Sequence, residues 1–231
     1  MGAIVIMLVF VLLSWIVSSQ LKSRFKRYSE IPVNYGMSGK DVAEKMLQEN
    51  GIYDVKVISV PGQLTDHYNP LDKTVNLSPD VYNGRNVSAA AVAAHECGHA
   101  IQHANAYAPL KLRSALVPIQ NVSAKIMNVI FIAMFFGAFA FQRIFPIDLA
   151  LLVIIGCYAV FSLFALITLP VEINASQRAL AWLSNSNVTG QGNYPQAKDA
   201  LKWAAYTYVV AALSSLAMLA YYLMIFLGRR D

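Results

Sequence analysis

Four long apolar stretches limit the folds available to this chain of 231 residues. They cover about residues 2–19, 126–145, 147–169 and 204–227, and each approaches the roughly 20 residues that an α-helix needs to cross a bilayer. Only 13% of the residues are charged and 57% are hydrophobic, so the chain carries about half the charge of a soluble domain. The sequence therefore predicts a mainly α-helical membrane protein with four transmembrane helices.

The positive charges beside the first stretch indicate how the chain is oriented. A cleaved signal peptide carries positive charge before its apolar core, whereas here no Lys or Arg precedes residue 22 and a cluster begins there (Lys22, Arg24, Lys26 and Arg27). This order favours an uncleaved anchor with its N-terminus outside. In that orientation, fifteen of the eighteen Lys and Arg residues lie in residues 20–125 and 170–203, which we expect in the cytoplasm.

The apolar stretches divide the chain into five regions. We expect an N-terminal anchor at 1–20, a cytoplasmic region at 21–125, a two-helix transmembrane hairpin at 126–169, a cytoplasmic segment at 170–203 and a C-terminal transmembrane helix at 204–228. The two cysteines do not suggest the disulfide framework of a secreted domain. The net charge of +5 does not indicate nucleic-acid binding, because no basic stripe with interleaved aromatic residues occurs.

Local signals in the region 21–125 predict a small α+β domain. A capping-box pattern that starts at Ser38 opens a helix. A strand is expected near residues 55–60, followed by a short β-hairpin whose turn is Asn-Pro-Leu-Asp at 69–72. Ser88 is then expected to cap a long alanine-rich helix.

That alanine-rich helix carries His95, Glu96 and His99 in an H-E-x-x-H arrangement. Residues four apart project from one face of a helix, so His95 and His99 can both donate a ring nitrogen to one zinc ion. Glu96 lies beside them, in the position of the general base of zinc peptidases. The alternative is that both histidines are ordinary surface or buried side chains of the helix, but a zinc site accounts better for their spacing.

A catalytic zinc site needs a third protein ligand, and few residues are available for that role. His103 lies eight residues after His95, rather than the ten of the longer H-E-x-x-H-x-x-G-x-x-H pattern. Asp148 and Glu172 flank the third apolar stretch, and the expected topology places only Glu172 on the cytoplasmic side with the histidines. Glu172 could equally be an interfacial charge at the end of a transmembrane helix.

The residues around Glu172 carry a resemblance to a known family. The chain closely resembles the bacterial neutral zinc metallopeptidases of the YugP-like family in the segments LPVEINASQRAL, GQLTDHYNP, KTVNLS, VYNGR and AAHECGHAIQH. The likeness covers nearly the whole chain, including the four apolar stretches. The spacing of Glu172 and Ala175 is more distantly similar to the third-ligand helix of HtpX-type membrane gluzincins, in which the alanine permits close packing on the motif helix.

The resemblance implies a zincin-like cytoplasmic domain in which His95, His99 and Glu172 bind Zn²⁺ and Glu96 is the catalytic base. It also implies a multi-pass protein of the bacterial inner membrane that acts on peptides or membrane proteins near the lipid bilayer. Where HtpX-type enzymes usually have an Asp after the alanine, this chain has Ser176. Another group must therefore orient the ligand histidine.

The expected reaction is metal-assisted hydrolysis of a peptide bond. Glu96 would take a proton from water and pass it to the leaving amine, while a nearby donor stabilises the oxyanion. His67 and Tyr68 are candidates for that donor, since their strand could border the cleft and pair with an extended substrate. Arg178 is a further candidate. His67 could instead support the hairpin turn, and Arg178 could lie at the membrane surface.

Two other functions could use the same residues. An intramembrane-cleaving metalloprotease would place the motif helix within the hydrocarbon, but that helix holds three His, a Gln and an Asn between residues 95 and 105. A non-catalytic membrane scaffold with a structural zinc would need a fourth ligand, for which Cys97 is available, although it points away from His95 on a helix. We therefore favour a membrane-embedded zinc metalloendopeptidase whose site faces the cytoplasm.

Overall fold

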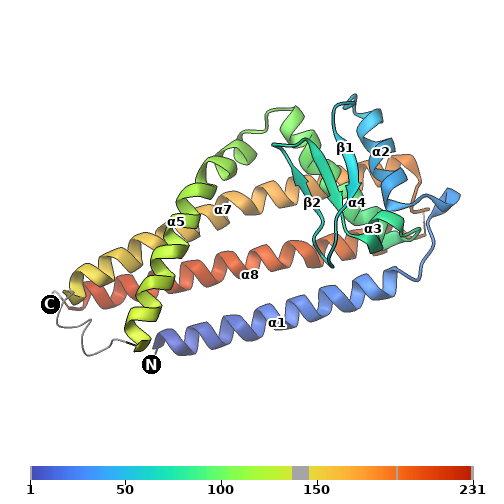
Figure 1. Cartoon of the computed structure of the whole chain (residues 1–231). Coiled ribbons are helices and arrows are strands. Elements are labelled where there is room, and N and C mark those ends of the chain that lie inside the picture. Colours follow the sequence, from blue (N-terminus) through green and yellow to red (C-terminus); the bar gives the residue numbers. More distant parts are fainter. Residues whose placement is uncertain (1, 137–145, 191, 230–231) are drawn as a thin grey trace. The chain divides into compact units, whose positions relative to one another are not determined.

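The computed structural model describes residues 2–136, 146–190 and 192–229. The chain divides into two compact units, which Figure 1 shows within the whole chain. The first unit comprises Met1–Trp15, Leu112–Leu169 and Tyr208–Asp231, and the second comprises Ile16–Lys111 and Pro170–Thr207. The described residues are mostly helical, with one small three-stranded sheet in the second unit.

Among the described residues, four helices are long and apolar enough to cross a membrane, which confirms that part of the sequence-based prediction: α1 (Gly2–Tyr28), α5 (Ala108–Phe136), α7 (Ile147–Ser186) and α8 (Tyr194–Leu227). Each is helical beyond the apolar stretch that predicted it, because Lys, Arg, Gln and similar polar residues also have good helix propensity. Residues 137–145 of the second predicted span lie outside the described residues.

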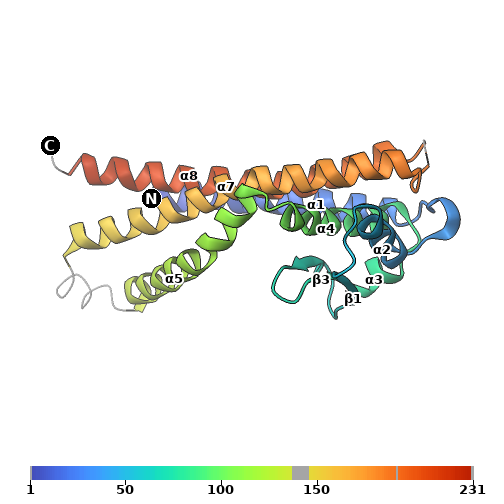
Figure 2. The ribbon, with the colours of Figure 1, turned by 90° about the horizontal axis from the view of Figure 1, so that it is seen from above.

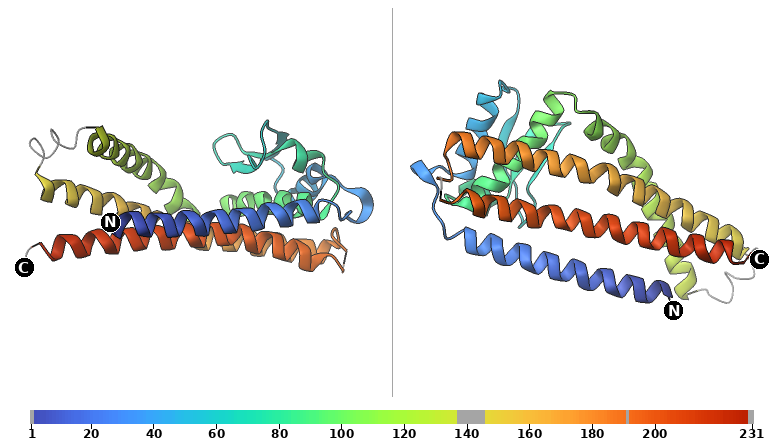
Figure 3. Two further views of the ribbon diagram at one scale, coloured as in Figure 1. Left: turned by 90° about the horizontal axis from the view of Figure 1, so that it is seen from below. Right: turned by 180° about the vertical axis from the view of Figure 1, so that it is seen from behind.

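The first unit exposes apolar side chains, and two of its helices contact each other through aromatic rings. Leu8 and Trp15 on α1 and Val129 on α5 are each more than half exposed, which is unfavourable in water and suits the hydrocarbon of a bilayer. The α7 and α8 portions of this unit run side by side (Figure 3), and Tyr158 stacks on Tyr222 with ring centroids 5.6 Å apart. Its composition and packing therefore suit a membrane-embedded part.

The second unit begins with the predicted helix and its capping box. After η1 (Asn34–Gly36), α2 runs over Gly39–Glu49. The backbone N–H of Ser38 donates to Asp41 at 2.8 Å, and the hydroxyl of Ser38 accepts from the backbone N–H of Asp41 at 3.2 Å. Gly51 then adopts a φ of +72°, the left-handed conformation that commonly ends helices. The local sequence alone fixes both ends of this helix.

The sheet contains the predicted hairpin and one further strand. Its order is β1 (Lys56–Ser59), β3 (Thr74–Leu77), β2 (His67–Asn69). β2 pairs with β3 in antiparallel fashion, which confirms the hairpin, while β1 pairs with β3 in parallel. All four residues of β3 are buried, as expected of a central strand. The strand order makes β2 an edge strand. The sheet packs beside α4 (Val87–Ala104), the motif helix, and β2 lies close to that helix (Figures 1 and 2).

The start of α4 corrects one local prediction. After α3 (Pro79–Asn83), the N-cap of α4 is Asn86, whose side-chain oxygen accepts from the backbone N–H of Ala89 at 2.9 Å. Ser88 was expected to be the cap, but it lies inside the helix and its hydroxyl donates to the same oxygen. Asn86 takes the capping position because it keeps the extended backbone that an N-cap requires.

Candidate metal centre

The motif helix α4 contacts α7 where each helix has a small residue, Gly98 on α4 and Ala175 on α7. A Cβ atom built on Gly98 would stand 2.5 Å from the carbonyl oxygen of Ala175, which is itself fully buried. Only glycine fits at this position without moving a backbone. The contact brings the face of α4 that carries His95 and His99 against the turn of α7 that carries Glu172.

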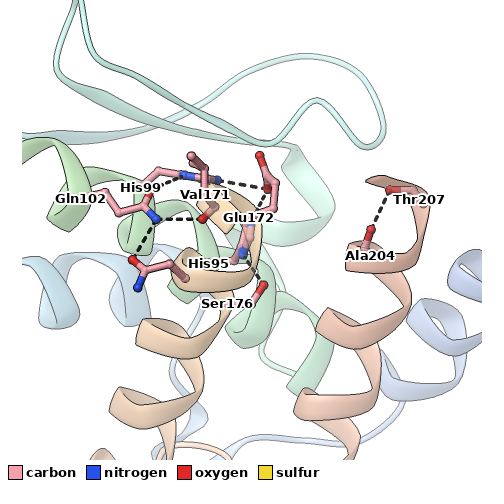
Figure 4. Close-up of polar contacts among 9 residues, drawn as sticks. His95, His99, Gln102, Val171, Glu172, Ser176, Ala204 and Thr207 are labelled. Carbon is pink, nitrogen blue, oxygen red and sulfur yellow. Dashed lines mark hydrogen bonds and ion pairs between the residues drawn. The ribbon is translucent and has the colours of Figure 1, made fainter. Parts of the chain in front are cut away.

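Three ligand atoms meet at this contact, as Figure 4 shows. Nε2 of His95 lies 3.3 Å from Oε2 of Glu172, and Nε2 of His99 lies 3.4 Å from the same oxygen. The two imidazole rings stand edge to face, with centroids 4.8 Å apart. Glu172 is only 2% exposed. Within the part of the chain that the structure describes, this is the one cluster of His, Cys, Asp or Glu side chains arranged to hold a metal ion.

The spacing of these atoms fits a zinc ion. Zinc binds nitrogen and oxygen ligands at about 2.0–2.1 Å, and the tetrahedral angle then separates two ligand atoms by about 3.3 Å. The two distances from Glu172, 3.3 and 3.4 Å, match that separation. Two imidazole nitrogens and one carboxylate also form a donor set typical of catalytic zinc sites, in which a fourth position stays open for water.

The other ring nitrogens of both histidines have hydrogen-bonding partners. Nδ1 of His95 lies 3.1 Å from the hydroxyl of Ser176, and Nδ1 of His99 lies 3.0 Å from Oε1 of Gln102 (Figure 4). Such bonds orient metal-binding histidines in general. Ser176, which follows Ala175 on α7, therefore contacts His95. Both rings are held so that Nε2 faces Glu172.

The charges of the three side chains depend on one another. Burial opposes a charged imidazole, but the hydrogen bond with Glu172 and the nearby Glu96 carboxylate outweigh it and hold the pKa of His99 above its ordinary value. Burial would likewise raise the pKa of Glu172, yet its two histidine partners hold that pKa well below its ordinary range. Glu172 is therefore an anion, as a metal ligand must be.

The two residues that follow His95 have different surroundings. Glu96 is buried, and its carboxylate acts electrostatically on His99, so it lies close to the ligand cluster. The thiol of Cys97 instead contacts the backbone carbonyl of Ala43 on α2 at 3.5 Å. Burial, with a smaller effect from Glu96, raises the pKa of Cys97 well above its ordinary value and disfavours the thiolate that binds metals.

The hairpin candidates for an oxyanion donor make different contacts. Nδ1 of His67 lies 2.7 Å from the carbonyl of Thr65, and its Nε2 lies 3.2 Å from the side-chain nitrogen of Asn76. Both nitrogens thus contact the hairpin and its flanking loop, which favours a supporting role. The hydroxyl of Tyr68 lies 2.8 Å from Nδ1 of His103, one turn beyond the motif, and so joins the edge strand to α4.

Arg178 contacts the cluster through other residues. Its Nε donates to the side-chain oxygen of Asn174 at 2.8 Å, and that oxygen also accepts from Nε2 of Gln102 at 3.0 Å. Sequence reasoning gave no role to Gln102 or Asn174. One signal was present, because Gln102 follows His99 by three residues and so shares its face of the helix.

The fold and the ligand cluster indicate a membrane-associated protein of the metallopeptidase kind, and comparison with known proteins agrees. The chain belongs to the family described as "Putative neutral zinc metallopeptidase", whose model matches residues 3–227. It is 40% identical over 219 residues to the "Putative membrane protease YugP" of Bacillus subtilis (strain 168), an alignment that covers 95% of this chain and 94% of that protein. No solved structure matches the chain. The family resemblance seen in the sequence is thereby confirmed.

Proposed function

We propose that this chain is a membrane-embedded zinc endopeptidase in which His95, His99 and Glu172 bind the metal and Glu96 is the general base. One observation carries the proposal: the buried carboxylate of Glu172 on α7 lies 3.3 and 3.4 Å from Nε2 of two histidines on α4, the separation expected between ligand atoms of a tetrahedral zinc ion. Membership of a family described as zinc metallopeptidases supports the assignment of metal and reaction.

The chemistry follows from the surroundings of Glu96. A zinc ion held by the three ligands would polarise the scissile carbonyl and acidify a water molecule. Glu96 lies beside His99 in a largely buried site, where its carboxylate can accept the proton of the attacking water and deliver it to the leaving nitrogen. Burial strengthens these electrostatic interactions, because little water screens them.

We place this site on the cytoplasmic side of the membrane. Fifteen of the eighteen Lys and Arg residues lie in residues 20–125 and 170–203, and the positive-inside rule assigns such segments to the cytoplasm. The ligands belong to the second unit, which has a sheet and polar helices of its own. These features favour a site outside the hydrocarbon over an intramembrane-cleaving enzyme.

The edge strand β2 is the best candidate for substrate binding. One side of β2 pairs with β3, and its other edge has no strand partner among the described residues, so this edge could bind an extended peptide by strand addition, which depends little on sequence. Tyr68 on this strand contacts His103 of the motif helix, so we favour Tyr68 over His67 as the oxyanion donor. Unfolded segments of peptides or membrane proteins are the expected substrates.

The contacts of Cys97 disfavour a non-catalytic scaffold with a structural zinc. A closed structural site needs four protein ligands, and the described residues bring together three. Cys97 was the obvious fourth, but its thiol is directed at Ala43 on α2. An open fourth position is what a catalytic site needs.

The proposal can be tested on purified protein in detergent by measuring bound zinc together with cleavage of casein. Glu96→Gln should keep its zinc and lose about 10²–10⁴-fold in activity, because a general base contributes that much. Glu172→Ala should lose zinc and activity together. Glu44→Gln is the matched control, since Glu44 is a surface residue paired with Lys40 on α2 and should change neither property.

Three outcomes would contradict parts of the proposal. Full zinc occupancy in Glu172→Ala would exclude Glu172 as a ligand, and full activity in Glu96→Gln would exclude Glu96 as the base. A wild-type protein that binds zinc tightly but cleaves neither casein nor unfolded membrane-protein segments would favour the scaffold.

A further inference from the structure

A pocket that is separate from the ligand cluster lies beside the end of α1, within the second unit. Its volume is about 570 Å³, which is within the usual range for small-molecule sites. The last turns of α1 form one wall, and the loop 61–66 and the start of α3 form the other. Its lining combines apolar, basic and acidic side chains: Phe25 and Leu64, Lys22 and Lys26, Asp66 and Asp80.

The length of α1 places this pocket at the surface of the bilayer. Residues 2–19 are predominantly apolar, and at 1.5 Å per residue they extend over about 27 Å, close to the roughly 30 Å of the hydrocarbon core. Lys22 follows within one turn, and Lys26 lies one turn further. Their ammonium groups therefore reach the level of the lipid headgroups, whichever way the chain crosses the membrane.

The basic wall of the pocket suits a phosphate group. Lys22 and Lys26 are exposed and lie four residues apart on one face of α1, where like charges repel each other. Within the described residues, neither ammonium group forms a salt bridge, whereas Arg24 between them pairs with Asp199 at 2.7 Å. A phosphate bound between the two lysines would remove the repulsion and accept hydrogen bonds from both.

The opposite wall favours a ligand that also carries a positive charge. Oδ1 of Asp66 accepts from the backbone N–H of Ser78 at 2.7 Å and from its hydroxyl at 3.0 Å, which fixes the carboxylate in place. Asp80 is exposed in the first turn of α3, and its side chain has no partner among the described residues. These two carboxylates would repel a purely anionic ligand and attract an ammonium group.

The loop 61–66 adds an apolar side chain to the same pocket. Leu64 has a φ of +57°, a left-handed conformation that is unfavourable for a residue with a side chain. Its side chain is 56% exposed, and it lines the pocket together with Phe25 of α1. An exposed leucine at the bilayer surface can contact the glycerol and the first carbons of the acyl chains of a lipid.

We infer that this pocket binds the headgroup of an ethanolamine phospholipid. Lys22 and Lys26 bind the phosphate, Asp80 and Asp66 bind the ammonium group, and Leu64 and Phe25 contact the glycerol end. Ethanolamine fits better than choline because its ammonium group has N–H donors for the carboxylates. The inference goes beyond the proposed peptidase function and does not depend on it.

Native mass spectrometry of the full chain in detergent tests the inference. The protein is mixed with equal amounts of phosphatidylethanolamine, phosphatidylglycerol and phosphatidylcholine, and the retained lipid is identified. The wild type should retain mainly the ethanolamine lipid. Lys26→Gln should retain about tenfold less of it, because a hydrogen bond between charged groups contributes at least that factor. Asp80→Asn should lose the preference for ethanolamine over the other two headgroups.

Two neighbouring charges provide matched controls. Arg27→Gln removes a positive charge next to Lys26, and Glu30→Gln removes a negative charge close by, but neither residue lines the pocket. Both variants should retain lipid as the wild type does. Millimolar inorganic phosphate should not displace the lipid, since it lacks the ammonium group. Lys22→Gln should behave as Lys26→Gln does, and it carries the test if Lys26→Gln does not fold.

Four results would overturn the inference. Equal retention of the three lipids would show that the pocket does not recognise ethanolamine. An equal loss in Arg27→Gln and Lys26→Gln would show that the basic cluster only attracts lipids through its overall charge. Displacement by inorganic phosphate would identify a site for free phosphate, and displacement by unfolded casein would assign the pocket to peptide substrates. None of these results depends on whether the protein binds zinc or cleaves peptides.

Discussion

Replacing Gly98 by alanine should separate the two helices that hold the proposed zinc ligands. The added Cβ would stand 2.5 Å from the carbonyl oxygen of Ala175 and 3.0 Å from its Cα. Comfortable contact between such atoms begins near 3.5 Å, so the backbones must move apart by roughly 1 Å. Neither helix backbone can yield as a flexible side chain would. We expect the overpacking to destabilise the protein by about 1–3 kcal/mol.

The same movement should weaken zinc binding. Oε2 of Glu172 lies 3.3 and 3.4 Å from the two histidine nitrogens, and metal sites tolerate shifts of only about 0.2 Å in their bond lengths. Gly98→Ala should therefore bind zinc at least about tenfold more weakly, equivalent to about 1.4 kcal/mol. Chelator competition and thermal unfolding measure the two effects.

The matched control is Gly156→Ala, another helical glycine, at which an added Cβ would meet no protein atom within 4 Å. If Gly98→Ala binds zinc as tightly as Gly156→Ala and melts at the same temperature, the close contact between α4 and α7 does not hold the ligands in place.

Two further predictions concern stability and pH. Ser38→Ala should cost about 1 kcal/mol at neutral pH. Hydrogen bonds from Ser38 hold the pKa of Asp41 in the folded protein below its ordinary value of 3.8. These hydrogen bonds therefore stabilise the folded protein fully above pH 3.8, and the stabilisation is lost as the pH falls through the pKa that Asp41 has in the folded protein. The melting difference between the variant and wild type should thus shrink in acid, and a constant difference would contradict this. In zinc-free protein, the lowered pKa of Glu172 contributes stability above pH 4.5, and the raised pKa of His99 contributes stability below pH 6.5. Chelator-treated protein should therefore melt highest between these two values, and a maximum in alkaline solution would contradict the coupling.

Features encoded within a few residues could be predicted from the sequence. The capping box at Ser38, the hairpin turn at residues 69–72 and the spacing of His95 and His99 each depend on local geometry. The choice of cap for α4 was wrong, because two capping residues lie two positions apart and local propensity does not decide between them. In the structure, an isolated β-bridge with Pro32 holds Asn86 in the extended backbone conformation of an N-cap.

Features that join distant segments required the structure. Two arguments from the sequence pointed to Glu172 as a third ligand: the distribution of Lys and Arg, which places it on the same side of the membrane as the histidines, and the family resemblance. No local sequence pattern shows that α7 contacts α4. The orientation of the Gln102 side chain beside His99 depends on the backbone carbonyl of Val171, which accepts a hydrogen bond from its amide at 2.8 Å. Periodicity places Gln102 on the face of His99, but the partners of its amide come from a helix nearly seventy residues later.

X-ray absorption at the zinc edge of the purified wild-type protein tests the central claim most directly. Three ligands from His95, His99 and Glu172 predict a first shell of nitrogen and oxygen atoms at about 2.0–2.2 Å, with the outer scattering of two imidazole rings. The same measurement on Glu172→Ala should show an altered shell or no zinc. A sulfur atom at about 2.3 Å would instead identify Cys97 or Cys157 as a ligand and contradict the site described for this protein.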